Sequence, residues 1–156
     1  MHRTLGKSTE ALNLELQVLD FSKKILGQSH PDTILAMGNL ASTYRNLGKY
    51  TAAEVLEIQV LHARKKIRGE KHPDTIIAMA NLACTYQNMG KYTDAGELEN
   101  KVLKLSEEIL GKEHPATILA MGNLAFTFKN LGKEVEAEAL EMQVLDLRKK
   151  FLGEEH

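Results

Sequence analysis

The sequence predicts an all-α solenoid of antiparallel helix pairs, with about three and a half repeats. One block of residues recurs every 42 residues, and its copies open with His30-Pro31, His72-Pro73 and His114-Pro115. The copies agree at more than half of their positions, and each contains two stretches with apolar residues at helical spacing. No stretch shows the alternation of a strand. A fixed period of this length indicates supersecondary units that stack on one another.

Size and composition suit one soluble repeat domain, expected over residues 1–156. Twenty basic and 21 acidic side chains leave a net charge of −1, so nothing favours binding to nucleic acid or to an anionic membrane. No apolar run approaches the roughly 18 residues that a membrane span needs. The single cysteine, Cys84, suits a reducing compartment, and we expect a cytoplasmic protein.

The first segment, residues 1–29, is expected to be a partial repeat. Leu5-Gly6-Lys7 occupies the columns of the turn between two helices, so the segment would be mainly a second helix, from about Ser8 to Leu26. Apolar residues along it, such as Leu12 and Phe21, would normally be covered by a preceding helix. Because Phe151 and Leu152 leave the other end equally apolar, we expect either a longer array or a homo-oligomer through these ends.

Residues 30–71 form the first complete repeat. Proline fits the first helical position because its missing N–H would be unpaired there, so His30-Pro31 starts a helix, and Gly48 ends it. Thr51 to Glu54 fits a capping box, which predicts a second helix from Thr51 to about Arg68. The expected apolar stripes are Met37, Leu40, Ala41, Tyr44 and Leu47 in the first helix, and Ala53, Leu56, Val60 and Ile67 in the second.

The following repeats, residues 72–113 and 114–155, have the same order of motifs, and His156 would open another. Alanine is invariant at one position of each helix. These small side chains predict a close approach of the two helices of a pair. The positions are Ala41, Ala83 and Ala125 in the first helices and Ala53, Ala95 and Ala137 in the second.

The order Asn-Leu-Ala-x-Thr-Tyr, Leu-Gly-Lys-Tyr, Ala-Glu-x-Leu, Val-Leu and Gly-x-x-His-Pro resembles the 42-residue tetratricopeptide repeats (TPRs) of kinesin light chains. It is also similar to arrays attached to NB-ARC-type switch proteins. The resemblance covers essentially the whole chain and implies a right-handed superhelix whose first helices line a concave, ligand-binding side. Lys133-Glu134-Val135, Gly96 and Phe128 depart from the pattern.

The resemblance places the candidate peptide-binding residues on the first helices, on the face opposite the apolar stripe. Each helix offers asparagines, one variable residue and one long polar residue, and an asparagine side chain can pair with a peptide bond of any sequence. The same face begins with Leu35, Ile77 and Leu119. The candidates are Asn39, Ser42, Arg45 and Asn46, then Asn81, Cys84, Gln87 and Asn88, then Asn123, Phe126, Lys129 and Asn130.

Two interpretations of these residues remain open. The asparagines could form hydrogen bonds with the backbone of an extended ligand. Alternatively, they could form hydrogen bonds between helices and shape the turns that follow them. Arg45 and Lys129 favour an acidic ligand, but they are only two cations over three repeats.

The sequence predicts neither an enzyme nor a cofactor or metal site. One histidine per stacked repeat is too dispersed for metal ligation, so helix capping or packing is the expected role of His30, His72, His114 and His156. Cys84 has no histidine partner in its repeat, no phosphate-binding glycine loop occurs, and the carboxylates are expected on exposed helix faces. The predicted function is a peptide-binding adaptor or sensor module of a larger protein. The alternative is a structural module that self-associates through its uncapped ends.

Overall fold

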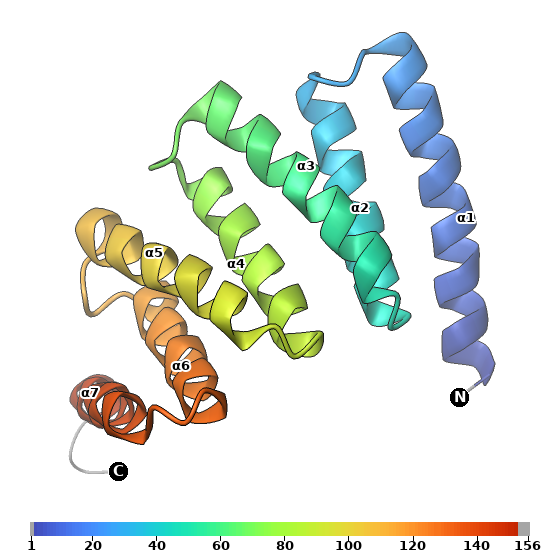
Figure 1. Ribbon diagram of the computed structural model, residues 1–156. Coiled ribbons are helices and arrows are strands. Elements are labelled where there is room, and N and C mark those ends of the chain that lie inside the picture. Colours follow the sequence, from blue (N-terminus) through green and yellow to red (C-terminus); the bar gives the residue numbers. More distant parts are fainter. Residues whose placement is uncertain (1, 153–156) are drawn as a thin grey trace. The chain divides into compact units, whose positions relative to one another are not determined.

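The structure is a computed structural model that describes the backbone of residues 2–152 and the side chains of residue 7 and residues 9–152. Seven helices and no strand occur in this part of the chain, which confirms the all-α prediction (Figure 1). Short connectors join consecutive helices. The helices are α1 (His2–Ile25), α2 (Pro31–Asn46), α3 (Tyr50–Arg68), α4 (Pro73–Asn88), α5 (Tyr92–Leu110), α6 (Pro115–Asn130) and α7 (Glu134–Leu152).

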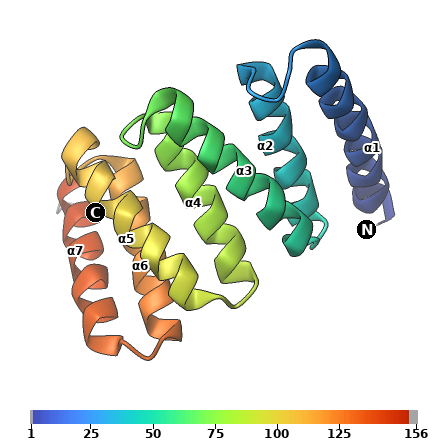
Figure 2. The same ribbon diagram turned by 45° about the horizontal axis from the view of Figure 1, so that its top comes forward.

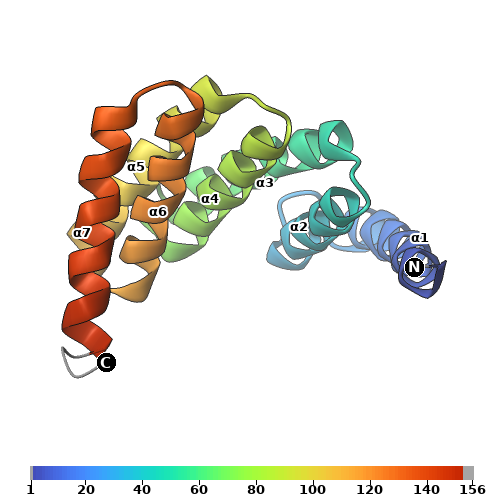
Figure 3. The same cartoon turned by 90° about the horizontal axis from the view of Figure 1, so that it is seen from below.

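The chain divides into two compact units, Met1–Thr85 and Tyr86–His156, with the boundary inside α4. In the first unit α2 packs against both α1 and α3, and in the second α6 packs against both α5 and α7 (Figure 2). Within each unit, one first helix is thus flanked by the second helix of the preceding repeat and by the second helix of its own repeat, and Figure 3 shows α6 alongside α7.

The recurring histidines cap helices, as predicted. The His30 Nδ1 atom accepts a hydrogen bond from the Asp32 backbone N–H at 3.1 Å, and His72 does the same for Asp74. His114 accepts from the Ala116 N–H at 3.0 Å. Each histidine thus satisfies one of the free N–H groups at a helix start, directly before the proline. His156 lies outside the described residues.

The glycines at the helix ends also behave as predicted. Gly48 has a φ of 77°, which turns the chain so that the Lys49 N–H bonds to the Tyr44 carbonyl at 2.8 Å. Gly69 has a φ of 88° after α3. Glycine alone adopts such a φ without steric cost, so these positions end their helices sharply.

Two predicted helix starts are wrong. The capping box at Thr51 does not form, because α3 begins at Tyr50 and its N-cap is Lys49, without a side-chain hydrogen bond. The turn at Gly48 and Lys49 leads directly into α3, so Thr51 lies inside the helix and is not its N-cap. The first helix begins at His2 and not at Ser8, so Gly6 lies inside it. A glycine inside a helix costs only about 0.5–1 kcal/mol relative to alanine, so the helix continues through Gly6.

The invariant alanines are buried as expected. Ala41 and Ala125 are 1% and 2% exposed, and Ala53 and Ala137 are fully buried. Most other predicted stripe positions are buried or half-buried, but Ile67 is exposed.

The expected apolar surface of α1 is divided between two faces. Leu12 and Leu19 are buried, whereas Leu16 and Phe21 are exposed. Since α2 is the helix that packs against α1, the second pair belongs to a face that α2 does not cover.

We predict that Ala125→Leu lowers the free energy of unfolding by about 1–3 kcal/mol, because the added atoms have no space between α6 and its neighbours. Chemical denaturation followed by circular dichroism measures the change. Ala139→Leu is the matched control, since Ala139 is exposed on α7. Equal effects of the two substitutions would contradict close packing at Ala125.

Candidate functional site

The first helices α2, α4 and α6 expose one large aliphatic side chain at the same position. Leu35 is 54% exposed, Ile77 57% and Leu119 62%. These residues lie off the packed stripes, so no neighbouring helix requires them to be apolar. They were not among the predicted site residues. Their signal in the sequence is an aliphatic residue conserved between copies on a helix face that is otherwise polar.

Most of the predicted ligand-binding residues share this exposed face. Asn39, Asn81 and Asn123 follow the aliphatic residue by four positions and are exposed. The variable residue comes three positions later. Ser42 is half-buried, Cys84 is exposed and Phe126 is 52% exposed. A spacing of four and then three residues puts these side chains on one stripe of each helix.

The asparagines of the last helical turn extend the stripe, and Asn46, Asn88 and Asn130 are all exposed. The Asn130 Nδ2 atom donates to the Phe126 carbonyl at 2.9 Å, inside its own helix. At Asn130, therefore, the side chain supports the end of α6, which was the structural alternative for these residues.

Arg45 and Gln87 point toward neighbouring helices of their units. Arg45 Nη1 lies 3.4 Å from the backbone carbonyl of Asn81 and 4.0 Å from Glu57 Oε2. Gln87 Nε2 donates to Glu99 Oε2 at 2.6 Å and also contacts Thr127 Oγ1 and the Asn123 carbonyl. Both side chains therefore link a first helix to the first helix of the next repeat.

Lys129 occupies the same position in α6 as Arg45 in α2 and Gln87 in α4, and it pairs with α7, the second helix of its own repeat. Its Nζ atom lies 2.9 Å from Glu141 Oε2, and the hydrogen bond with that carboxylate raises the pKa of Lys129.

Two glutamates are buried in the helix interfaces, which corrects the prediction that the carboxylates lie on exposed faces. Glu57 is 4% exposed and Glu99 is 5% exposed. Each accepts a hydrogen bond from a threonine of the following first helix, from Thr85 at 2.5 Å and from Thr127.

An equivalent bond joins Thr43 to Glu15, so one threonine–glutamate pair recurs in every repeat junction that lies within a unit. The signal in the sequence is a pair of invariant polar columns 28 residues apart, one in the second helices and one in the first helices of the following repeats.

Burial raises the pKa of both glutamates, and their neighbours determine by how much. For Glu57, the hydrogen bond from Thr85 and the positive charge of Arg45 oppose the raised pKa. For Glu99, burial raises the pKa to about 7, opposed only by hydrogen bonds from Thr127 and Gln87. Gln87 stands where the preceding repeat has Arg45, so this column supplies Glu99 with a neutral amide in place of a cation.

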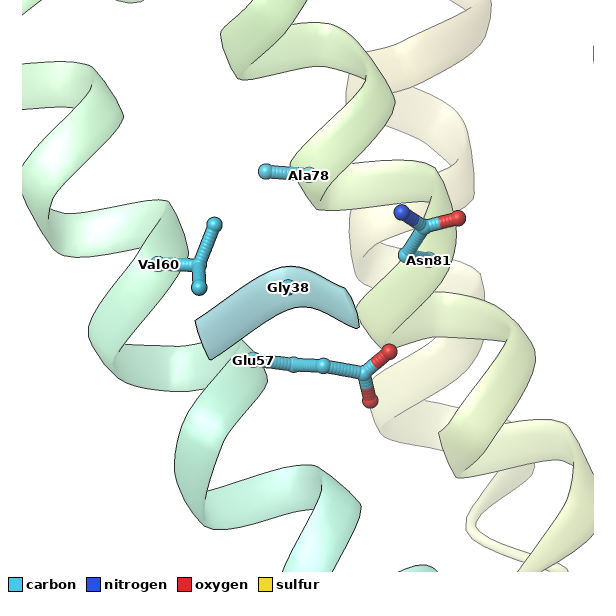
Figure 4. A pocket seen from close by; sticks show the side chains of 5 residues that line it. All are labelled: Gly38, Glu57, Val60, Ala78 and Asn81. Carbon is cyan, nitrogen blue, oxygen red and sulfur yellow. The ribbon is translucent and has the colours of Figure 1, made fainter. Parts of the chain in front are cut away.

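A small pocket of about 20 Å³ opens beside the first-helix face of the first unit (Figure 4). This volume suffices for one water molecule. The Glu57 carboxylate extends toward the Asn81 side of the pocket, and Val60 and Ala78 form its apolar walls (Figure 4). The lining residues are Gly38, Glu57, Val60, Ala78 and Asn81.

No cluster of three or more histidine, cysteine, aspartate or glutamate side chains in the described part of the chain is arranged to hold a metal ion. None of the described helices is both long and apolar enough to traverse a membrane.

Helix pairs joined by glycine turns and stacked at a 42-residue period define a helical-repeat protein. Sequence models of the tetratricopeptide repeat match residues 1–32, 33–74 and 85–150. The chain belongs to the tetratricopeptide repeat family, which confirms the resemblance to tetratricopeptide repeats. No curated protein matches the chain.

Similar solved structures support the same assignment. The nearly identical TPR-like repeats of a proposed kinesin light chain from Podosopora anserina share 29% identity with this chain, with a TM-score of 0.82 over 96% of it and 71% of the other chain. A single-residue variant of that protein gives a TM-score of 0.89 at 29% identity, over 99% and 73% of the two chains. BtubC (BKLC) from P. vanneervenii shares the fold at 19% identity, with a TM-score of 0.86 over 95% and 59%.

We predict that Glu99→Gln stabilises the protein at high pH. Between pH 4.5, the ordinary pKa of the carboxyl, and about 7, the unfolded chain releases this proton while the folded chain retains it. The stability of the natural protein therefore falls as pH rises through this window, and Glu99→Gln removes up to about 3 kcal/mol of that loss above it.

Denaturation of both forms at pH 4 and pH 8 measures the difference, which should be large only at pH 8. Glu97→Gln is the control, because Glu97 is exposed on the same helix. A constant difference across pH would contradict the raised pKa.

Proposed function

We propose that the exposed first-helix face of each unit binds an extended segment of a partner protein. Tetratricopeptide repeats generally mediate protein–protein interactions, and the proposal assigns that role to one face of this chain. The observation that carries it is the repeated exposure of Leu35, Ile77 and Leu119. An apolar residue kept at one solvent-exposed position in three repeats is explained by a contact outside the described chain.

The asparagines supply the polar part of this surface. Each amide offers one acceptor and two donor hydrogens, and Asn39 and Asn81 present theirs on α2 and α4. A ligand backbone has the matching N–H and C=O groups at every residue. The amides would therefore hold the backbone, while the aliphatic residues and the variable positions Ser42, Cys84 and Phe126 select ligand side chains.

An acidic ligand would have to compete with the chain's own carboxylates. Arg45 faces Glu57, and Lys129 is bonded to Glu141. Displacing either partner would leave the glutamate without its cation, and for the buried Glu57 that loss is costly. The surface therefore favours a ligand with apolar side chains over one recognised mainly by negative charge.

We further propose that the module is a non-catalytic adaptor or sensor of a larger protein. The two buried carboxylates, those of Glu57 and Glu99, accept hydrogen bonds from threonines of neighbouring helices. Attachment to a nucleotide-binding switch domain of NB-ARC type remains a prediction from the resemblance, as does a cytoplasmic location.

We predict that the double variant Asn39→Ala with Asn81→Ala captures peptides at least about tenfold more weakly, since two buried amide contacts with the ligand would be lost. An array of 15-residue peptides, including apolar, acidic and aromatic members, identifies the ligands, and fluorescence anisotropy measures affinity.

Asn13→Ala with Asn100→Ala is the matched control, because both residues are exposed on second helices. Unchanged affinity in the double variant at α2 and α4, with helicity preserved, would remove the asparagines from the proposal.

A second candidate function is self-association through α1. Its uncovered side carries Leu14, Val18, Phe21 and Ile25, between 54% and 66% exposed and spaced four, three and four residues apart. This spacing forms one apolar stripe that α2 does not cover.

If α1 mediates self-association, sedimentation will show dimers whose fraction rises with concentration, and Phe21→Glu will shift the dimerisation constant at least about tenfold. Ser22 is buried, so a substitution there would test stability and not association. A natural protein that stays monomeric at high concentration would exclude this function.

A further inference from the structure

The contact between α5 and α6, here called the α5–α6 junction, contains a buried glutamate. Thr127, which is fully buried on α6, donates its hydroxyl to Oε1 of Glu99. Gln87, in the last turn of α4, donates to Oε2 at 2.6 Å. Both donors are neutral, so they reach the carboxyl group without bringing a charge. The α5 residues three and four positions from Glu99 are buried too, and they are Ala95, Gly96, Val102 and Leu103.

The equivalent position of the preceding repeat is built differently. There Arg45 occupies the position of Gln87, and its Nη1 atom lies 4.0 Å from Glu57 Oε2. A threonine donates to the buried glutamate in both repeats. The two sites thus share the carboxyl group and the hydroxyl, but one has a cation where the other has an amide.

The charged side chains of the two first helices that contact Glu99 have partners of their own. Lys129, the one charged residue of α6, lies 2.9 Å from Glu141 on α7. Asp74, the one charged residue of α4, lies 3.5 Å from Arg64 in the first unit. Both pairs direct their charges to residues other than Glu99.

The charged residues of α5 and of the connector before it complete these surroundings. Glu97 and Lys101 lie two positions from Glu99 along α5, and both are exposed. The Lys91 Nζ atom lies over the ring of Tyr86, 5.7 Å from its centroid. The groups that oppose the effect of burial on Glu99 are therefore the two neutral hydrogen-bond donors.

These surroundings determine when Glu99 loses its proton. Burial raises the pKa of Glu99 to about 7, whereas in an opened junction the carboxyl group meets water and returns to its ordinary pKa of 4.5. Between these two values the closed junction retains the proton and the opened junction releases it. Closing therefore becomes less favourable as the pH rises through this window. For Glu57, Arg45 opposes the raised pKa, although Glu54 adds to it.

The same heavy atoms can satisfy the protonated form of Glu99. Its proton can lie on Oε1 and be donated to Thr127 Oγ1. The Thr127 hydroxyl can then turn to the carbonyl of Asn123, four residues earlier, as threonines inside helices do. Gln87 Nε2 lies 3.2 Å from that carbonyl and 2.9 Å from Thr127 Oγ1, so these groups are close together. Protonation thus removes the buried charge without moving the helices apart.

We propose that Glu99 makes the packing of α6 on α5 sensitive to pH, so that the junction is tight while Glu99 carries its proton and loosens when the proton is lost. Gln87 permits this behaviour, because an arginine at its position would stabilise the ionised carboxylate. Since α6 carries Leu119, Asn123 and Phe126, opening would also weaken peptide capture by these residues. That consequence rests on the function proposed above, whereas the packing of α6 does not.

Hydrogen exchange of the full chain at pH 5.5 and pH 7.5, followed by NMR and corrected for intrinsic rates, measures the opening of each helix. The opening constant of the α6 amides should be about 20-fold larger at pH 7.5, given pKa values of 4.5 and about 7 for Glu99 in the open and closed states. The α2 amides of the first unit should change less than about threefold. An equal change in α2 and α6 would mean that Glu99 acts only on global unfolding, which would overturn the proposal.

Three substitutions test the residues that carry the proposal, and each pH ratio is taken within one variant, so that a constant change in stability cancels. Glu99→Gln should abolish the ratio, because an amide has no proton to lose. Gln87→Arg should reduce it to below about fivefold by supplying a cation. The reverse exchange, Arg45→Gln, should increase the pH dependence of the α4 amides up to Thr85 at least about threefold.

Two controls separate Glu99 from other titrating groups. Glu97→Gln removes an exposed carboxyl group from the same helix and should leave the ratio unchanged. The His114 Nδ1 atom accepts the Ala116 N–H at the start of α6, and a proton on Nδ1 would end that bond and loosen α6 at low pH, in the opposite direction. Asparagine caps a helix at either pH, so His114→Asn should keep the ratio.

The proposal is wrong if the α6 amides open equally at both pH values, or if Glu99→Gln retains the difference. It is equally wrong if Gln87→Arg leaves the ratio unchanged, or if His114→Asn abolishes it. None of these measurements depends on peptide capture through Asn39 and Asn81 in the first unit, so the two proposals fail independently.

Discussion

A buried hydrogen bond from a threonine to a glutamate joins one repeat to the next within each unit. Thr85 bonds to Glu57 and Thr127 to Glu99, and both threonines are fully buried. A carboxylate in a helix interface is costly to desolvate, so it is tolerated only where donors meet it. Apolar stripes alone allow neighbouring helices to slide and rotate, whereas one hydroxyl must meet one carboxylate. The bond therefore sets the register in which hairpins stack.

This constraint also decides which residues remain available to a ligand. Arg45 and Gln87 are long and polar, and in an isolated helix they would reach into solvent. Here they turn toward Glu57 and Glu99 and bond to the backbone of the next first helix. The surface left over consists of short amides and aliphatic side chains, and it suits a peptide backbone better than a cluster of charges. The proposed specificity thus follows from the demands of stacking.

The periodic sequence predicts the helices, the glycine turns and the histidine caps, because each of these depends on neighbouring residues in the chain. It does not predict that Glu57 is buried. Glutamate is polar wherever it stands, and its burial depends on a helix that begins sixteen residues later with Pro73. The start of α1 differs from the prediction for another reason. Gly6 stands in the column of glycines that end helices, but a glycine is also tolerated inside a helix at a modest cost, so the column alone does not decide its conformation.

Because the repeats are near-copies of one another, the burial of one residue type can be compared in two different surroundings. Leu61 and Leu145 are the same residue type in the same column, flanked by the same glutamate and arginine, yet one is buried and the other is half exposed. The column that faces the helix of its own pair does not change, as Val60 and Val144 show. The difference between the two leucines therefore reflects their surroundings and not their own chemistry.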